Sequence, residues 1–396
     1  MSDKKVFFMV NAGEISPDKS GGASVYYSHI QLLHAIGYQV HLIVCIWDNI
    51  TKYNPKDYQK VQDHIKEITP FYTVETPGNK GFKRLYYALV DPLRFEYAFL
   101  NRKNLNNLRQ LLHAQKYDLV WCEWRWTAIL YARLKEKVKA IYSHHDWEYK
   151  LAKHKNRDTI KQKFHQFQKK RGEFSLVKSF TASVSGSYTE SIEIEKITKK
   201  KALYLPTTYV TKKTVKEIGE TSLVHLGGMN TTANRIGLER FLDVCWKRIK
   251  QSHPTIKLKV VGSMSHATPS LLEKVKDHAI KVEGFVEDLN TVMYSSDIHI
   301  IPWEYNTGTR TRLPVALNFE QAVVATKASI KAFPEMINDK NVLLCDTLED
   351  MTVKIKSLLE NPEKRAYLGK AGKETFLDTF TLNGQLKKFE TFIESI

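Results

Sequence analysis

A short apolar run, a glycine-containing loop and an apolar-faced helix open the chain, and this order restricts the fold more than any other feature of the sequence. Residues 6–10 are continuously apolar, as expected of a strand buried in a parallel sheet. The polar stretch that follows contains Gly21 and Gly22. Residues 25–36 carry apolar side chains at helical spacing, and a second strand-sized run, apolar except for His41, covers residues 40–45. The segment is therefore predicted to be a βαβ unit, which requires a parallel sheet.

The alternation of predicted strands and helices continues along the chain and falls into two series. A polar segment, residues 206–221, separates them and is interpreted as a linker. The predicted fold is α/β, with two Rossmann-like doubly wound domains facing a cleft, where ligands bind beyond the carboxyl ends of the strands. The predicted boundaries are residues 1–208 for the first domain, 218–376 for the second, and 377–396 for a C-terminal helix that crosses back to the first domain.

Composition excludes several classes of protein. The four cysteines show no paired spacing, so neither a disulfide scaffold nor a zinc ribbon is expected. No stretch approaches the ~20 apolar residues of a membrane span, and no signal-peptide core follows the N-terminus. The predicted location is the cytoplasm, with peripheral membrane contact. Lysine and arginine exceed the acids by 17, which indicates an anionic partner: nucleic acid, an acidic membrane or a phosphorylated ligand.

Three motifs follow predicted strands. Residues 223–229 form a strand that ends in Gly-Gly-Met, and a helix begins soon after it at Asn234 and Arg235. Residues 300–312 comprise a strand, a proline and a loop with glycine, threonine and two arginines, and another helix follows. In the first domain, residues 143–148 read Ser-His-His-Asp-Trp-Glu at the end of a strand.

These motifs and the order of the elements resemble the group 1 family of GT-B glycosyltransferases, over nearly the whole chain and most closely in its C-terminal half. The resemblance implies a retaining enzyme that moves a sugar from a nucleotide-sugar donor to a glycan or lipid-linked acceptor. The second domain then binds the nucleotide sugar, and the first lies on the acceptor side. The sequence has no D-x-D pair, zinc spacing or P-loop, so we predict that the reaction needs no metal and no cofactor beyond the donor substrate.

The family's pattern assigns the donor diphosphate to the second domain. A glycine turn lets the backbone approach a phosphate, and a helix N-terminus favours negative charge. Guanidinium groups suit two-pronged phosphate contacts, so Arg310 and Arg312 are predicted to stabilise the leaving group. The alternative is a surface loop with solvated arginines. The predicted donor-binding residues are Gly21, Gly22, Gly227, Gly228, Met229, Asn234, Arg235, Glu304, Thr307, Gly308 and Thr309.

One position departs from the family's pattern. The family has a glutamate that binds the donor ribose where this chain has Val315. The identity of the nucleotide is therefore not predicted, although Glu304 could replace the missing carboxylate in part. A GT-B subunit without catalytic activity is kept as an alternative for the same reason.

The first-domain motif matches the family's His-Asn-x-Glu pattern. The match places His145 beside the donor sugar, and we predict it to be catalytic together with the two arginines. Glu148, Trp124 and Trp126 are predicted to bind the acceptor, because aromatic faces next to carboxylates suit sugars. Packed core tryptophans are the favoured alternative for the aromatic pair.

Much of the basic excess lies between residues 151 and 178, a predicted helix with nine basic and two acidic residues. Ile160, Phe164, Phe167 and Phe174 fall on one side of it. Such a helix can lie on an anionic membrane, and the alternative is that it packs its phenylalanines on the domain. Two alternative functions stay open. One is a GT-B-fold sugar-nucleotide epimerase. The other is a nucleic-acid-binding protein, but the sequence shows no recognition module for it, so nucleic acid is not among the predicted partners.

Overall fold

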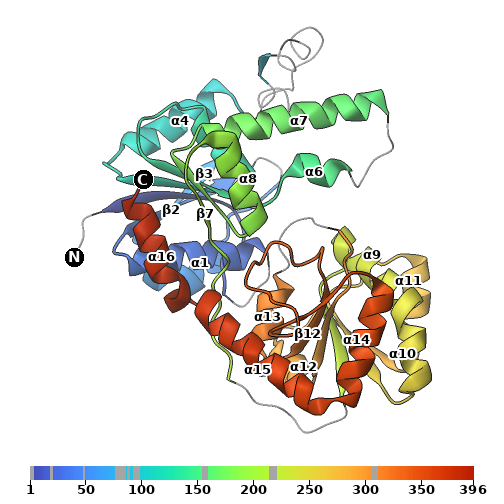
Figure 1. Cartoon of the computed structure of the whole chain (residues 1–396). Helices are drawn as coiled ribbons and strands as arrows, with labels where there is room; N and C mark the ends of the chain where they lie inside the picture. The colour runs from blue at the N-terminus through green and yellow to red at the C-terminus, as the bar shows by residue number, and fades with distance from the viewer. Residues whose placement is uncertain are drawn as a thin grey trace. The chain divides into compact units, whose positions relative to one another are not determined.

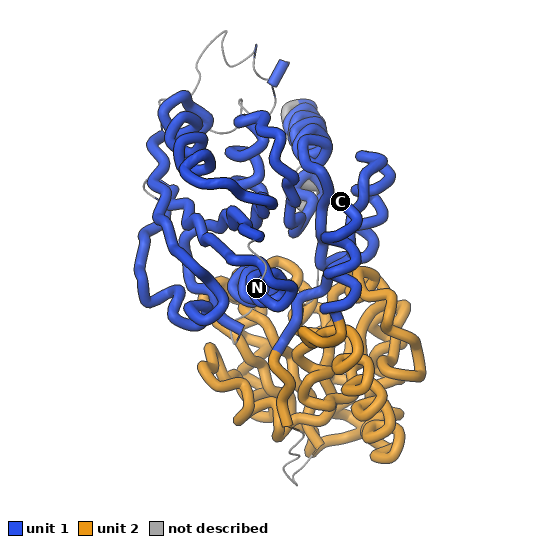
Figure 2. The backbone as a smooth tube through the Cα atoms, turned by 90° about the vertical axis from the view of Figure 1, so that its left-hand side faces the viewer, with its two compact units in different colours: residues 1–209, 385–396 blue, residues 210–384 orange. Residues whose placement is uncertain are grey.

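The computed structural model divides the chain into two compact units (Figure 2). Unit 1 comprises Met1–Tyr209 together with Gln385–Ile396, and unit 2 comprises Val210–Gly384. The sequence predicts a first domain that ends at residue 208 and a second that begins at residue 218. The residues that the structure describes are 4–17, 21–47, 50–75, 86, 90, 91, 99–153, 159–213, 221–305 and 311–396.

Unit 1 is built on a seven-stranded sheet with the order β3-β2-β1-β4-β5-β6-β7, in which all neighbours are parallel. β1 is central: Val6 pairs with Val40 of β2 on one side and with Leu119 of β4 on the other. The chain winds outward in both directions from this point, so the strand order reverses between β1 and β4. The strands are β1 Lys5–Asn11, β2 Gln39–Ile46, β3 Glu67–Tyr72, β4 Leu119–Glu123, β5 Ala140–His144, β6 Ala182–Ser185 and β7 Ala202–Tyr204.

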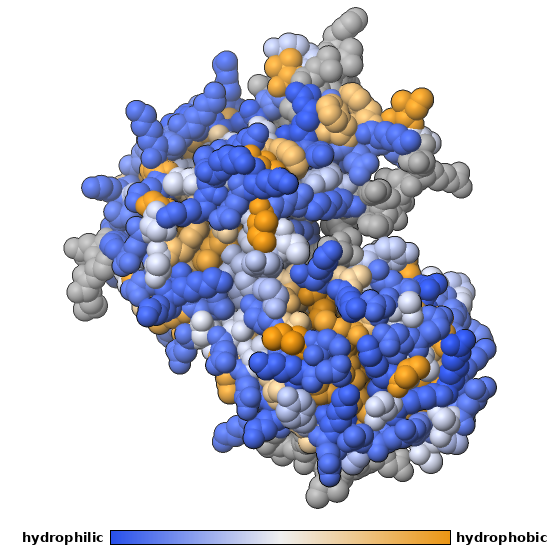
Figure 3. Space-filling view, in the orientation of Figure 1, coloured by the Kyte–Doolittle hydropathy of each residue, from blue (hydrophilic) through white to orange (hydrophobic). Residues whose placement is uncertain are grey.

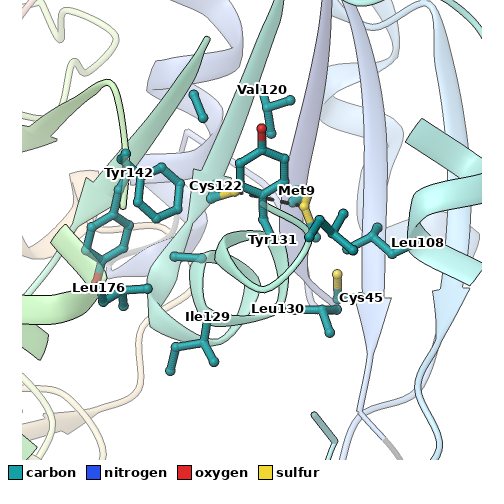
Figure 4. Packing of buried hydrophobic residues seen from close by; sticks show 14 of the residues in the cluster. Met9, Cys45, Leu108, Val120, Cys122, Ile129, Leu130, Tyr131, Tyr142 and Leu176 are labelled. Atoms are coloured by element: carbon teal, nitrogen blue, oxygen red, sulfur yellow. Dashed lines mark hydrogen bonds between the residues drawn. The ribbon is translucent and has the colours of Figure 1, made fainter. Parts of the chain in front are cut away.

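Buried apolar side chains from the strands and helices form the core of unit 1. Figure 4 shows Met9, Cys45 and Cys122 inside it, with the thiol of Cys122 3.9 Å from the sulfur of Met9. All four cysteines of the chain are buried and free. The helices are α1 Gly22–Ala35, a 3-10 helix Pro55–His64, α4 Arg102–His113, α5 Trp124–Ala132, α6 Glu148–Lys153, α7 Ile160–Lys178, α8 Tyr188–Thr198 and α16 Leu382–Glu394.

The last helix completes unit 1 although unit 2 precedes it in the chain (Figures 1 and 2). Phe389 of α16 is fully buried, and its ring lies 6.0 Å from that of Trp121 in β4. The ammonium group of Lys388 donates a hydrogen bond to the carbonyl of Tyr204, 2.9 Å away. The segment from Gln385 onward is therefore part of the core of unit 1.

Unit 2 has a six-stranded parallel sheet with the order β10-β9-β8-β11-β12-β13, and its strand order reverses between β8 and β11. Helices α9, α10 and α14 pack on one side of this sheet, and α12, α13 and α15 on the other (Figure 1). The strands are β8 Ser222–Leu226, β9 Lys257–Val261, β10 Ile280–Gly284, β11 Ile298–Ile301, β12 Ala322–Thr326 and β13 Leu343–Cys345. The helices are α9 Thr232–Phe241, a π-helical turn Leu242–Trp246, α10 Lys247–Ser252, α11 Pro269–Lys274, α12 Asn290–Met293, α13 Arg312–Asn318, α14 Leu348–Glu360 and α15 Pro362–Thr379.

The structure confirms the predicted fold class of two doubly wound α/β units and corrects some of its elements. The sequence predicts a helix over residues 57–68, but this segment is a 3-10 helix that gives way to β3. β3 contains Pro70 and is an edge strand, the place where a sheet tolerates a missing N–H donor. Most of the expected linker after residue 213 lies outside the described residues. None of the helices in the described ranges is long and apolar enough to cross a membrane.

Candidate active site

Two glycine turns meet beyond the carboxyl ends of β8 and β9 in unit 2. Gly227 and Gly262 have φ angles of +143° and +131°, which favour glycine. A Cβ atom on Gly262 would lie 2.6 Å from the carbonyl carbon of Gly227 and from the amide nitrogen of Gly228. The amide of Met229 donates to the carbonyl of Ser263, 2.8 Å away. The backbones of both turns therefore touch, and no side chain fits between them.

Helix α9 begins at this turn, and two side chains in its first turn hold the turn in place. The side-chain amide of Asn234 donates to the carbonyl of Gly228 at 2.9 Å. One guanidinium nitrogen of Arg235 donates to the carbonyl of Met229 at 3.1 Å. The first turn of α9 contains no acidic residue, so nothing there offsets the positive end of the helix dipole.

Arg312, the first residue of α13, joins three elements in the interior of unit 2. It is only 7% exposed, and its guanidinium lies 3.1 Å from Nε2 of His225 in β8. The same group donates to the side-chain oxygen of Asn234. Burial lowers the pKa of His225 well below its usual value, and the nearby charges of Arg312 and His299 lower it further. His225 is therefore neutral, and its Nε2 accepts a hydrogen bond from the guanidinium. Arg312 thus fixes Asn234, which in turn holds the glycine turn.

In unit 1, a buried carboxylate lies between two histidines at the carboxyl end of the sheet. Glu123, the last residue of β4, is fully buried. Its Oε1 lies 2.5 Å from Nδ1 of His29 in α1, and its Oε2 lies 3.1 Å from Nε2 of His145, which follows β5. The indole N–H of Trp121 also donates to Oε1, at 2.7 Å.

Aromatic rings surround His145. Trp124 stands edge-on to its imidazole with 5.2 Å between ring centroids, and Tyr26 of α1 does so at 6.0 Å. Trp124 has a φ of +67°, a backbone conformation that costs a bulky residue about 1–2 kcal/mol. Backbone strain of this kind persists only where the surrounding structure enforces it, and such positions cluster at functional sites.

A sequence comparison identifies the domain that carries the glycine turns. Residues 220–361 match the sequence model of the family described as Glycosyl transferases group 1. Unit 2 is a group 1 glycosyl transferase domain. The chain that carries this domain is therefore a glycosyltransferase. No curated protein sequence matches the chain.

Solved structures similar to the whole chain place both units in the GT-B fold. Anabaena HepE in complex with UDP matches with a TM-score of 0.69 at 13% identity, over 99% of this chain and 100% of that one. A TarM variant of S. aureus, in complex with Fondaparinux, alpha-GlcNAc-glycerol and UDP, matches with a TM-score of 0.70 at 11% identity, over 98% and 99% of the two chains. The lipopolysaccharide outer core galactosyltransferase WaaB matches with a TM-score of 0.63 at 10% identity, over 99% of each chain. At these identities the likeness shows the fold.

Within the group 1 domain, the structure brings together part of the predicted donor site. Gly227, Gly228, Met229, Asn234 and Arg235 form one turn with the helix that follows it, and Arg312 contacts that turn through Asn234. Glu304 instead pairs with Arg240 on the third turn of α9. Thr307, Gly308, Thr309 and Arg310 lie outside the described residues.

The predicted residues of unit 1 separate into those near His145 and those that stabilise the fold. Gly21 precedes α1 with a φ of +73°, and Gly22 begins the helix. Trp124 lies beside His145. Trp126 packs against Trp47 and Phe99 of the core, in agreement with the alternative of a packed tryptophan.

Glu148 belongs to a cluster of ion pairs. Its carboxylate lies 2.8 Å from the guanidinium of Arg125 and 3.1 Å from the ammonium group of Lys169. Arg125 also pairs with Glu173 at 2.9 Å, and both are buried. The carboxylate of Glu173 accepts the backbone N–H of Glu148 at 2.9 Å. These contacts hold α5, α6 and α7 together, and they commit Glu148 to two cations before any acceptor binds.

Sequence reasoning missed Glu123 and His29 as members of the site. A signal was present for Glu123, because a carboxylate directly after a buried strand points to the ligand-binding edge of a parallel sheet. His29 carried no signal: it lies inside a helix, and only the packing of α1 on the sheet brings it to Glu123. His225 carried no signal either: it is a polar residue within a buried strand, and only the packing of α13 on the sheet brings Arg312 to it.

Proposed function

We propose that the chain transfers a sugar from a uridine-diphosphate sugar to a glycan or lipid-linked acceptor, with retention of configuration and without a metal ion. The observation that carries the proposal is the pair of touching glycine turns after β8 and β9, the first of which leads into α9. The first turn of α9 has no acidic residue, so backbone can approach a diphosphate at this helix N-terminus. Uridine is chosen because HepE was solved in complex with UDP and with UDP-glucose.

The leaving diphosphate gains negative charge as its bond to the sugar breaks. We assign stabilisation of this charge to the N-terminus of α9 and to the arginines Arg235, Arg310 and Arg312. Preorganised donors aimed at developing charge supply the largest catalytic contribution in many enzymes. In a retaining transfer the diphosphate can itself take the proton of the acceptor hydroxyl, so no separate base is assigned.

The acceptor side is assigned to unit 1, where Trp124 contacts the acceptor and His145 lies beside the donor sugar. His145 is 14% exposed in its side chain, and Trp124 beside it is half-buried, so both have surface left for a ligand. Two proteins of the same fold support a glycan acceptor: the S. aureus TarM variant was solved with Fondaparinux and alpha-GlcNAc-glycerol, and WaaB is a lipopolysaccharide outer core galactosyltransferase. The cytoplasmic location stays a prediction.

A nucleotide screen tests the donor assignment. We expect UDP and UDP-sugars to raise the melting temperature of the protein, and GDP-, dTDP- and CMP-sugars to do so less, because binding to the folded state alone stabilises it by mass action. At a hundred times the dissociation constant the gain is about 2.7 kcal/mol. EDTA should leave the shift unchanged. A shift with GDP-sugars alone would contradict the uridine assignment, and a shift that EDTA abolishes would contradict metal independence.

We also propose that α7 docks on an anionic membrane, in keeping with a lipid-linked acceptor. Ile160, Phe164 and Phe167 on its N-terminal part are 88%, 45% and 55% exposed, whereas Phe174 further along packs on the core. Figure 3 shows apolar atoms standing among hydrophilic ones over this helix. Lys163, Lys170 and Arg171 are exposed on the same helix. The alternative of a helix that packs all its phenylalanines on the domain is therefore wrong for Phe164 and Phe167.

Vesicle flotation tests this docking surface. At about 50 mM salt we expect binding to vesicles of phosphatidylcholine with phosphatidylglycerol and none to phosphatidylcholine alone, since screening is weak and the helix is cationic. Replacing Phe164 and Phe167 together by serine should weaken binding about tenfold or more. Val353→Ser, which alters an exposed apolar residue of α14, is the matched control and should bind as the unmodified protein does. Failure of the unmodified protein to float with anionic vesicles would contradict the proposal.

A further inference from the structure

Three polar side chains of unit 1 meet where ligands of parallel sheets bind. The strand order of unit 1 reverses between β1 and β4, and sites in open parallel sheets lie beyond the carboxyl ends of the strands at such a reversal. Glu123 is the last residue of β4, His29 lies on the helix that follows β1, and His145 follows β5. The fold therefore brings one carboxylate and two imidazoles to the reversal point.

The carboxylate at this point is ionised. Burial would raise the pKa of Glu123, but the two histidines beside it lower the pKa well below its usual value. An ionised carboxylate can only accept hydrogen bonds. It accepts from Trp121 and from His29 on Oε1, so its contact with His145 on Oε2 also requires a hydrogen on the imidazole nitrogen.

The contact with Glu123 therefore determines which nitrogen of His145 carries the hydrogen. Nε2 faces the carboxylate, at 3.1 Å, and must be the protonated nitrogen. In the neutral imidazole Nδ1 is then a hydrogen-bond acceptor. Within the described part of the chain, no residue donates a hydrogen bond to Nδ1. The edge-on rings of Trp124 and Tyr26 oppose rotation of the imidazole.

We propose that Glu123 is a positioning residue, which fixes His145 with its hydrogen on Nε2 so that Nδ1 accepts a hydrogen bond from a hydroxyl group of the sugar substrate. The substrate part of this inference rests on the proposed function, whereas the state of the imidazole does not. His145 then selects for a hydroxyl that donates its hydrogen, and a ligand group that can only accept is disfavoured at this point.

Nitrogen NMR of the protein with ¹⁵N-labelled histidine tests the imidazole state without any substrate. The His145 signal is assigned by its loss in His145→Gln. At about pH 8 we expect the imidazole of His145 to carry its hydrogen on Nε2. A hydrogen on Nδ1 in the unmodified protein would overturn the inference, and this result needs no variant of Glu123 to fold.

Substitution of Glu123 tests the consequence for the reaction. In Glu123→Gln the amide can also donate, so we expect part of the His145 population to carry its hydrogen on Nδ1 and UDP-sugar turnover to fall about 10- to 100-fold. Glu123→Asp keeps the carboxylate and should restore the Nε2 signature and part of the turnover. Unchanged turnover in Glu123→Gln together with a shifted imidazole state would overturn the role in substrate binding. If the unmodified protein does not bind UDP at all, the proposed function is contradicted instead.

Discussion

Arg312→Ala is expected to lower UDP-sugar turnover by at least about 100-fold while the protein stays folded. The substitution removes a buried cation and leaves the Asn234 oxygen and the His225 nitrogen without their donor. A buried acceptor that loses its donor costs about 1–3 kcal/mol, and loss of one preorganised donor typically lowers turnover by about 10²–10³. Release of UDP from the sugar nucleotide chosen in the thermal screen measures the effect.

Two controls give this result its meaning. Arg248→Ala makes the same chemical change at an exposed position of α10 and should leave turnover unchanged. Circular dichroism of Arg312→Ala should retain the spectrum of the unmodified protein. Near-normal turnover in Arg312→Ala would remove Arg312 from the diphosphate site.

Gly262→Ala is expected to destabilise unit 2 by about 3 kcal/mol or more and to weaken UDP binding at least tenfold. The φ of +131° is unfavourable for alanine, and the new Cβ would lie 2.6 Å from backbone atoms of the neighbouring turn. Backbone cannot rotate away as a flexible side chain does, so the two turns must separate. Denaturant unfolding and UDP titration measure the two effects.

Gly237→Ala is the matched substitution in the same unit. Gly237 lies inside α9, and its Cβ would meet Pro302 at 3.5 Å, an ordinary van der Waals contact. Alanine is favoured over glycine in a helix by up to about 1 kcal/mol, so this variant should be slightly more stable. If Gly262→Ala instead unfolds at the same denaturant concentration as the unmodified protein, the close approach of the two turns is wrong.

The sequence predicted the fold well because parallel strands leave a local signal. The continuous apolar run of residues 6–10 marks a buried strand whatever lies beside it, and residues 222–226, apolar except for Ser222 and His225, still stand out from the polar segment before them; both are strands in the structure. The 3-10 helix and β3 were harder to predict. β3 is an edge strand that contains a proline and a glutamate, so its sequence lacks the continuous apolar run of a buried strand. α8 and β7 lie in a polar stretch for which no element was predicted.

The candidate site was only partly predictable, because its side chains act through partners far away in sequence. The residues at the glycine turn could be named from one segment. The partners of Arg312 could not: His225 is 87 residues away and Asn234 is 78 residues away, and their contact arises only when the sheet forms. The pairing of His29 with Glu123 spans 94 residues in the same way. Sequence motifs thus locate the turns, and packing decides which side chains the turns recruit.

The return of α16 to unit 1 affects how the protein can be made. A ribosome releases domains in chain order, and each folds as a unit once it is complete. Here residues 385–396, which bury Phe389 against Trp121, emerge only after the whole of unit 2. Unit 2 is therefore the first that can finish folding, although it comes second. Until residues 385–396 have been synthesised, the side of Trp121 that Phe389 covers stays exposed to water. During this period the apolar surface is open to contact with other chains.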